Sequence, residues 1–109
     1  IIDRNNIQID GFTEDIMPLN PLDKKLDAFN FHVQVIDGHD FSQIIGAMSE
    51  AQAVFDRPSV IIANTIPGKG VKGFERKYEW HGKAPNKEEA QMALKELHTL
   101  GGKIRAEHE

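Results

Sequence analysis

Residues 32–64 read HVQVIDGHDFSQIIGAMSEAQAVFDRPSVIIAN, and this stretch decides the fold. His32 to Ile36 is typical of a strand, and the Asp37-Gly38 pair is typical of the turn after it. Apolar residues then recur at helical intervals at Phe41, Ile44, Ile45, Met48, Ala51 and Phe55. The apolar run Ser59–Asn64 predicts a strand covered on both faces. Strand, helix and strand at this spacing predict a βαβ unit with parallel strands.

Capping signatures predict where the two longer helices begin. Asp40 and Gln43 have the spacing of a capping box, so we expect the central helix to start after Asp40. Asn86 and Glu89 have the same spacing, and we expect the final helix to run from Asn86 to a stop at Gly101-Gly102.

The upstream part of the chain continues the alternation of strands and helices. The apolar start at Ile1 is strand-like. Asn20 and Pro21 read as the N-cap and first-turn proline of a short helix that ends near Asn30. We expect this helix to present Leu22, Leu26 and Phe29 on one face. Alternation of this kind predicts an α/β fold.

The composition excludes several classes of function. The chain has 109 residues, 39% of them apolar and 28% charged, and a formal net charge of -4. An acidic balance argues against a nucleic-acid partner, and no stretch approaches the roughly 20 apolar residues of a membrane span. The absence of cysteine excludes disulfides and thiolate metal sites. No signal peptide is visible, so we expect a cytoplasmic protein, although the start at Ile1 without methionine indicates a truncation.

Three loops are candidates for chemistry, because ligands of open parallel sheets bind beyond the carboxyl ends of the strands. These loops are Asp3 to Gly11, Asp37 to Asp40, and Asn64 to Pro85, and we expect them to share one edge. The glycines of the third loop invite a phosphate-loop interpretation, but Val71 follows Gly70 where a hydroxyl would be needed, so the match is poor. The first loop is open to two interpretations: a plain Asx-rich turn, or an oxygen site for a hard cation.

Among the five histidines, His81 is open to two interpretations, a structural residue or a functional one. It lies between Trp80 and Gly82 in a loop long enough to fold over a site. Imidazole is the usual acid, base and hydrogen-bond donor near neutral pH. The other four are interpreted as structural or solvated, and they are His32, His39, His98 and His108.

The loops together resemble the transketolase family. The segment 5–13, NNIQIDGFT, is similar to the end of that family's thiamine diphosphate motif, which begins with Gly-Asp-Gly. The segments 14–19, 37–40, 65–70 and 80–85 also resemble the family, in the same order, so the resemblance covers nearly the whole chain. The sequence of residues 80–85 is most similar to that of bacterial and archaeal transketolases whose two halves are separate polypeptides. The resemblance implies the back half of a doubly wound, mainly parallel sheet, with residues 1–109 as part of one thiamine diphosphate-binding domain.

The resemblance also implies roles for five residues. The Asn5 side chain and the Ile7 carbonyl oxygen would bind Mg²⁺, or another divalent cation such as Ca²⁺ or Mn²⁺, which bridges the diphosphate of the cofactor. Ile9 and Ile66 would pack against the cofactor's rings. His81 would lie near the diphosphate and the sugar hydroxyl groups as a catalytic hydrogen-bond donor and proton carrier.

The activity implied by the resemblance is the reversible transfer of a two-carbon ketol unit from a ketose phosphate to an aldose phosphate, as in the pentose phosphate pathway. The Gly-Asp-Gly segment with its metal-binding aspartate is missing from the sequence, and so is a pyrimidine-binding domain. We therefore expect the fragment alone to be inactive. The complete protein is expected to act as a homodimer or as paired N- and C-terminal subunits.

Two other interpretations stay open at this point. The chain could belong to another thiamine diphosphate enzyme, such as a deoxyxylulose-phosphate synthase or a ketoacid dehydrogenase component. It could also be a non-catalytic interaction module that retains the fold. The sequence of residues 80–85 favours a transketolase over another thiamine diphosphate enzyme.

Overall fold

The computed structural model describes residues 1–106. These residues form two compact units, each of which is described by itself. The first unit comprises residues 1–6 and 12–65. The second unit comprises residues 7–11 and the chain from residue 66 onward.

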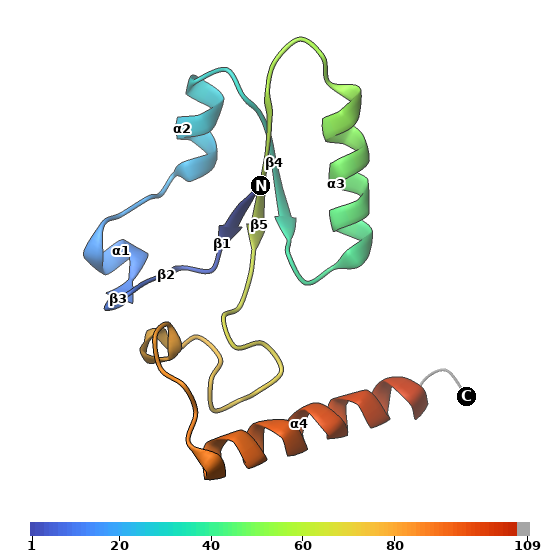
Figure 1. The fold of residues 1–109 in the computed structure, drawn as a ribbon. Coiled ribbons are helices and arrows are strands. Elements are labelled where there is room, and N and C mark those ends of the chain that lie inside the picture. Colours follow the sequence, from blue (N-terminus) through green and yellow to red (C-terminus); the bar gives the residue numbers. More distant parts are fainter. Residues whose placement is uncertain (107–109) are drawn as a thin grey trace. The chain divides into compact units, whose positions relative to one another are not determined.

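A three-stranded parallel sheet forms the centre of the first unit (Figure 1). Its strands are β1 (Ile2–Arg4), β4 (His32–Asp37) and β5 (Ser59–Asn64), in the order β1-β5-β4. Helix α3 (Phe41–Ala53) connects β4 to β5. The βαβ unit and the α/β class predicted from the sequence are therefore confirmed.

Two helices cover opposite faces of this sheet (Figure 1). From β4, Gln34 Nε2 donates a hydrogen bond of 3.1 Å to the Ala47 carbonyl of α3. The next residue, Val35, instead lines a pocket together with Leu22 of α2 (Leu22–Ala28). Because neighbouring residues of a strand point to opposite faces, α3 covers one face and α2 the other, as in a doubly wound sheet.

The core of the first unit is small and lies along β5. Ile61 and Ile62 are 5% and 3% exposed, and Ala47 of α3 is also buried. Consecutive buried residues confirm that β5 is covered on both faces. On α3, by contrast, Phe41 and Ile45 are mostly exposed. The helix ends at Ala53, so Phe55 does not belong to its apolar stripe, contrary to the prediction.

The start of α2 differs from the prediction. Its N-cap residue is Pro21, in an extended conformation, and no side chain caps the helix. The Pro21 carbonyl accepts the first helical hydrogen bond, from the Lys25 amide at 3.2 Å, so proline is the cap rather than the first helical residue. Asn20 lies one residue too early to cap. The predicted end is confirmed, because Asn30 has a left-handed φ of 66°, and Phe29 is exposed at the C-cap instead of packing on the helix face.

The remaining elements are short, except for the last helix. Strands β2 (Ile7–Gln8) and β3 (Gly11–Phe12) form a two-stranded sheet, and α1 (Thr13–Ile16) follows. A 3-10 turn, η1 (Tyr78–Trp80), precedes α4 (Lys87–Ala106).

Helix α4 begins as predicted but does not stop where predicted. The Glu89 carboxylate accepts from the Asn86 amide, and the Asn86 side chain accepts from the Glu89 amide, both at 2.8 Å. This is the predicted capping box. The helix then continues through Gly101-Gly102 to Ala106, because glycine permits a helix end without removing a backbone donor. The charged tail beyond Ala106 lies outside the described residues, as does His108. None of the described helices combines the length and apolar character that a membrane span requires.

Candidate functional site

The carboxyl ends of the three parallel strands meet at one edge of the first unit. Arg4 of β1 is in register with Asn64 of β5, and Asn64 is also in register with Asp37 of β4. The residues that follow these strands therefore begin at the same edge. For the first unit, this confirms the prediction that the loops after the strands share an edge.

Hydrogen bonds connect the loops at this edge. The Thr65 hydroxyl donates to the Asp3 carboxylate, and the Thr65 amide donates to the Arg4 carbonyl at 3.2 Å. The Gly38 amide donates to the Asn64 carbonyl at 2.8 Å. A Cβ at position 38 would lie 2.6 Å from Thr65 Cγ2, so only glycine allows the turn after β4 to approach the end of β5 this closely.

The turn between β4 and α3 caps the N-terminus of α3. The Asp40 carboxylate accepts from the Ser42 and Gln43 amides at 2.8 and 3.2 Å, and Gln43 Nε2 donates to it at 2.9 Å. These hydrogen bonds lower the pKa of Asp40, and the bond from the Gln43 side chain has the largest effect. Gln43 Oε1 accepts from the Asp37 amide rather than from the Asp40 amide of a standard capping box. The cap thus ties α3 to the end of β4.

Asn5 is the predicted metal ligand that lies in the first unit. It is half-buried and follows β1 directly. The carbonyl before it, on Arg4, accepts from the Thr65 amide, and the carbonyl after it, on Asn6, accepts from the Thr13 amide at 3.0 Å. Asn6 has a left-handed φ of 65°, which asparagine tolerates, and this reverses the chain. The backbone is therefore held on both sides of Asn5.

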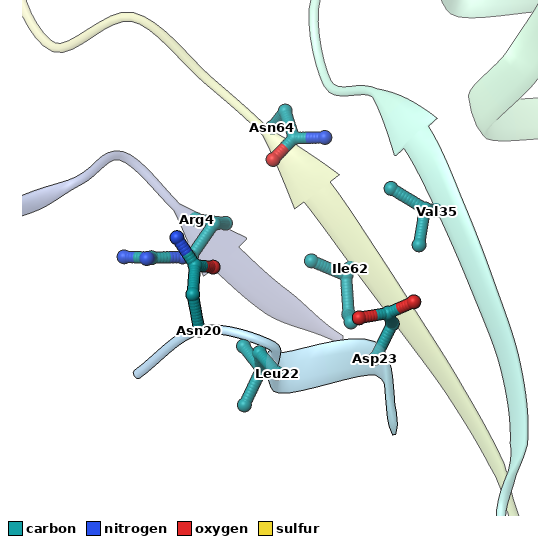
Figure 2. A pocket seen from close by; sticks show the side chains of 7 residues that line it. All are labelled: Arg4, Asn20, Leu22, Asp23, Val35, Ile62 and Asn64. Carbon is teal, nitrogen blue, oxygen red and sulfur yellow. The ribbon is translucent and has the colours of Figure 1, made fainter. Parts of the chain in front are cut away.

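Within the first unit, a pocket of about 180 Å³ lies between the sheet and α2 (Figure 2). Its apolar lining comes from Leu22, Val35 and Ile62. Its polar lining comes from Arg4, Asn20, Asp23 and Asn64. Asn20, which does not cap α2, contributes to this pocket instead.

The other four predicted site residues lie in the second unit. Ile7 and Ile66 are half-buried, whereas Ile9 exposes 57% of its surface. His81 is exposed and follows η1, where its amide donates to the Tyr78 carbonyl at 2.9 Å. The structure thus assigns Asn5 to one unit and Ile7, Ile9, Ile66 and His81 to the other.

The loop from 66 to 77 makes a close backbone approach at Gly68. Gly68 has a φ of 74°, and a Cβ there would lie 2.7 Å from the Phe74 carbonyl carbon. The Arg76 amide donates to the Pro67 carbonyl at 3.0 Å, which closes the loop on itself. The Lys72 amide donates to Glu96 of α4 at 2.7 Å. The loop is thus an ordered turn held by its own backbone and by a hydrogen bond to α4, and its contacts do not make a phosphate loop.

Contacts around Trp80 position the segment that carries His81. The rings of Trp80 and Phe74 lie with centroids 4.0 Å apart. Lys83 Nζ lies 4.3 Å from the Trp80 ring centroid and 3.1 Å from Glu89 Oε1. The hydrogen bond from the Asn86 amide, and then that from Lys83, lower the pKa of Glu89. The chain on either side of His81 is therefore attached to the start of α4.

The donor chemistry of the predicted site fits a hard cation. An asparagine amide oxygen and a main-chain carbonyl oxygen are ligands that Mg²⁺ and Ca²⁺ accept. Within residues 1–106, no three histidine or acidic side chains gather as a metal site. Two neutral oxygen ligands do not complete the coordination of such an ion, so the remaining ligands must be water, a bound anion or groups from another part of the protein.

Sequence reasoning missed the side-chain network beside Asn5. Arg4 is 6% exposed, and its guanidinium donates to Thr13 Oγ1 and to Glu14 Oε1, each at 2.8 Å. An arginine at the end of a strand, with a hydroxyl and a carboxylate nine and ten residues later, is the only signal of this network in the sequence.

Comparisons with known proteins place these loops in a family context. Residues 1–103 match the family described as "Transketolase, thiamine diphosphate binding domain". A 6-deoxy-6-sulfo-D-fructose transketolase subunit of Clostridium sp. strain MSTE9 is 42% identical over 99 residues, which are 91% of this chain and 36% of the relative. An apulose-4-phosphate transketolase subunit of Actinobacillus succinogenes is 40% identical over 97 residues, 89% of this chain and 35% of the relative.

A solved structure is also similar. The crystal structure of transketolase from Campylobacter jejuni matches 88% of this chain and 15% of that protein, with a TM-score of 0.78 and 29% identity. The chain spans about a third of the two curated subunits that it matches. None of these matches favours a deoxyxylulose-phosphate synthase or an interaction module.

Proposed function

The chain belongs to the transketolase family, as part of its thiamine diphosphate-binding domain, and we propose that the protein containing it transfers a two-carbon ketol unit between sugars. A ketose phosphate would be the donor and an aldose phosphate the acceptor. The match across residues 1–103 carries the proposal, because it includes both the Asn5 loop and the His81 loop.

Asn5 and Ile7 would hold the divalent cation, Mg²⁺ being the first candidate. Asn5 offers an amide oxygen on a backbone that is fixed on both sides, so its position costs little further ordering when the ion binds. Ile7 would contribute its carbonyl oxygen. Diphosphate oxygens and a carboxylate from the rest of the protein would complete the coordination.

Ile9 and Ile66 would form part of the apolar wall around the rings of the cofactor. Ile9 is 57% exposed in the second unit, although a side chain of this size is usually buried. An exposed isoleucine at this point gives an apolar ligand a surface to cover. Thiamine diphosphate supplies, when bound, the nucleophilic carbon and the electron sink that ketol transfer requires.

His81 would donate hydrogen bonds to the diphosphate and to sugar hydroxyl groups, and would carry a proton during transfer. Its ring is exposed, while the chain around it is attached to α4 through Trp80, Lys83 and Glu89. A titratable group on an ordered turn can meet a substrate without first ordering a loop.

The complete protein would need further parts. Relatives that are named as subunits and that extend well beyond this chain support a partner subunit or domain that supplies the pyrimidine-binding half. We propose that the functional protein is a homodimer or a pair of subunits in the cytoplasm, that it acts in the pentose phosphate pathway, and that residues 1–109 alone are inactive.

The two subunit relatives suggest which donors to compare. One relative is named for 6-deoxy-6-sulfo-D-fructose and the other for apulose 4-phosphate. Their identities of 42% and 40% make both named ketoses candidate donors for this protein. Both ketoses therefore belong in an assay beside an ordinary ketose phosphate.

The test is a transfer assay on the complete protein with its partner subunit, thiamine diphosphate and Mg²⁺. We expect product formation from at least one donor, and a loss of about 10²-fold to 10⁴-fold in kcat/KM for His81→Ala. His98→Ala, an exposed histidine of α4, is the matched control and should leave the rate unchanged. Cofactor binding without transfer from any of the donors would contradict the proposed activity.

A further inference from the structure

Arg4 is a buried cation beside the predicted metal ligand. It precedes Asn5 directly, and only 6% of it is exposed. Burying a guanidinium is costly unless its donors are satisfied. The structure therefore contains a specific arrangement of acceptors at the point where β1 ends and the Asn5 loop begins.

The first acceptor closes the Asn5 loop. Arg4 Nη1 donates to Thr13 Oγ1 at 2.8 Å, and Thr13 is itself only 8% exposed. The Thr13 amide and hydroxyl both donate to the Asn6 carbonyl, at 3.0 and 3.5 Å. The Arg4 side chain is thus connected, through one threonine, to the carbonyl on the far side of Asn5.

The second acceptor connects the same arginine to the chain that leads to α2. Arg4 Nη2 lies 2.8 Å from Glu14 Oε1. That oxygen also accepts from the Leu19 amide at 3.3 Å. Glu14 is 42% exposed, so its charge remains partly solvated while it neutralises the buried guanidinium. We use the name Asn5 clamp for the four residues of this network, which are Arg4, Asn6, Thr13 and Glu14.

We propose that the Asn5 clamp positions Asn5 for the divalent cation, so that Arg4, Thr13 and Glu14 are positioning residues of the cofactor site. The inference rests on the proposed function. The backbone hydrogen bond from Thr65 fixes the peptide group before Asn5, and the clamp fixes the peptide group after Asn6, so the loop that carries this ligand has a defined position. Groups that orient a metal ligand typically change metal affinity about 10-fold to 100-fold when they are removed.

A purely structural network would give a different result. It would lower the stability of the protein without changing the Mg²⁺ concentration that cofactor binding needs. A positioning network raises that concentration in a protein that is still folded. The Mg²⁺ requirement, measured beside thermal stability, separates the two roles.

The experiment uses the complete protein and titrates Mg²⁺ at a fixed concentration of thiamine diphosphate, with binding followed by calorimetry. Thr13→Val removes the hydroxyl at constant size, and Thr13→Ser restores it. Glu14→Gln keeps an oxygen acceptor without the charge. Arg4→Gln removes the centre of the clamp, and Arg57→Gln, at an exposed arginine of the same unit, is its matched control.

We expect Thr13→Val and Arg4→Gln to raise the Mg²⁺ concentration for half-maximal binding about 10-fold to 100-fold, and Glu14→Gln to raise it less. Thr13→Ser and Arg57→Gln should match the wild type. The double variant Arg4→Gln with Thr13→Val should be no worse than the more affected single variant, because both act through one path. If Arg4→Gln does not fold, Thr13→Val and Glu14→Gln decide the question.

The outcomes separate this inference from the proposed function. Binding by the wild type with an unchanged Mg²⁺ requirement in Thr13→Val and Glu14→Gln would overturn the clamp and leave the proposed function standing. A wild-type protein that shows no Mg²⁺-dependent binding would overturn both.

Discussion

The loop around Asn5 and the loop around His81 are held in different ways. The Asn5 loop is closed by a buried arginine with two side-chain acceptors and by backbone hydrogen bonds to Thr13 and to the residue after β5. The His81 loop is held near the surface, by a ring pair, a lysine over an indole and a capping carboxylate. A fixed geometry suits a metal ligand, whereas a group that meets successive substrates can lie on an exposed turn.

The largest effect is expected in the second unit, from Gly68→Ala. A side chain there would need a left-handed φ of 74° and would meet the Phe74 backbone at 2.7 Å. We expect a loss of about 2 to 4 kcal/mol in the free energy of unfolding, measured in urea. Gly73→Ala, where a Cβ would meet nothing within 4 Å, is the control. Equal stability of the two variants would show that the turn at Gly68 is not constrained.

Thr13→Val should have the next largest effect and tests the buried side of the comparison. It leaves an Arg4 donor without its acceptor in a buried position. The expected loss of unfolding free energy is about 1 to 3 kcal/mol. The control, Thr99→Val, removes an exposed hydroxyl that donates to the Lys95 carbonyl within α4, and should change stability by less than about 0.5 kcal/mol. Similar losses from both variants would contradict the difference in burial.

Lys83→Met tests the surface side of the comparison. It removes the cation over Trp80 and the ion pair with Glu89. Because Lys83 is 53% exposed, we expect a loss below about 1 kcal/mol. The emission of Trp80, the only tryptophan in this chain, should nevertheless shift. Lys95→Met is the exposed control, and an unchanged emission spectrum in Lys83→Met would argue against the contact.

The smallest effect concerns pH, and both units should show it. Asp40 and Glu89 have pKa values lowered from their ordinary values of 3.8 and 4.5. The stability that these carboxylates contribute is therefore complete above the ordinary values, and is lost as the pH falls below them through the lowered values. Thermal unfolding of Asp40→Asn and Glu89→Gln should depend less on pH in this acidic range than the wild type does. An identical dependence would show that neither cap is ionised in a folded-state hydrogen bond.

The sequence predicted the βαβ unit because its signals are local. Alternating and continuous apolar runs, with capping-box spacing at Asp40 and Asn86, predicted the strands and two helix starts that the structure has. Only Asn86 and Glu89 form the reciprocal box. The errors came where a local signal is permissive. Gly101-Gly102 allows a helix end without forcing one, and Asn20 is a good cap in general but lies one residue before the cap position.

The candidate site was only partly predictable. Asn5 and His81 are site candidates because the segments that contain them resemble the family's motifs, and their roles stay predictions. The Asn5 clamp could not be predicted, because its contacts join residues nine and ten positions apart across a reversed loop, which no periodicity reports. The hydrogen bond from Thr65 to Asp3 spans 62 positions and depends on the sheet being formed.

The most direct test of the central claim is calorimetric titration of thiamine diphosphate with Mg²⁺ into the complete protein and into its Asn5→Ala variant. Gln52→Ala, which removes an exposed side-chain amide from α3, is the control for loss of an amide in the same unit. We predict Mg²⁺-dependent binding by the wild type and the control, and its loss in Asn5→Ala. Equal binding by Asn5→Ala and the wild type would contradict the assignment of Asn5 as a metal ligand.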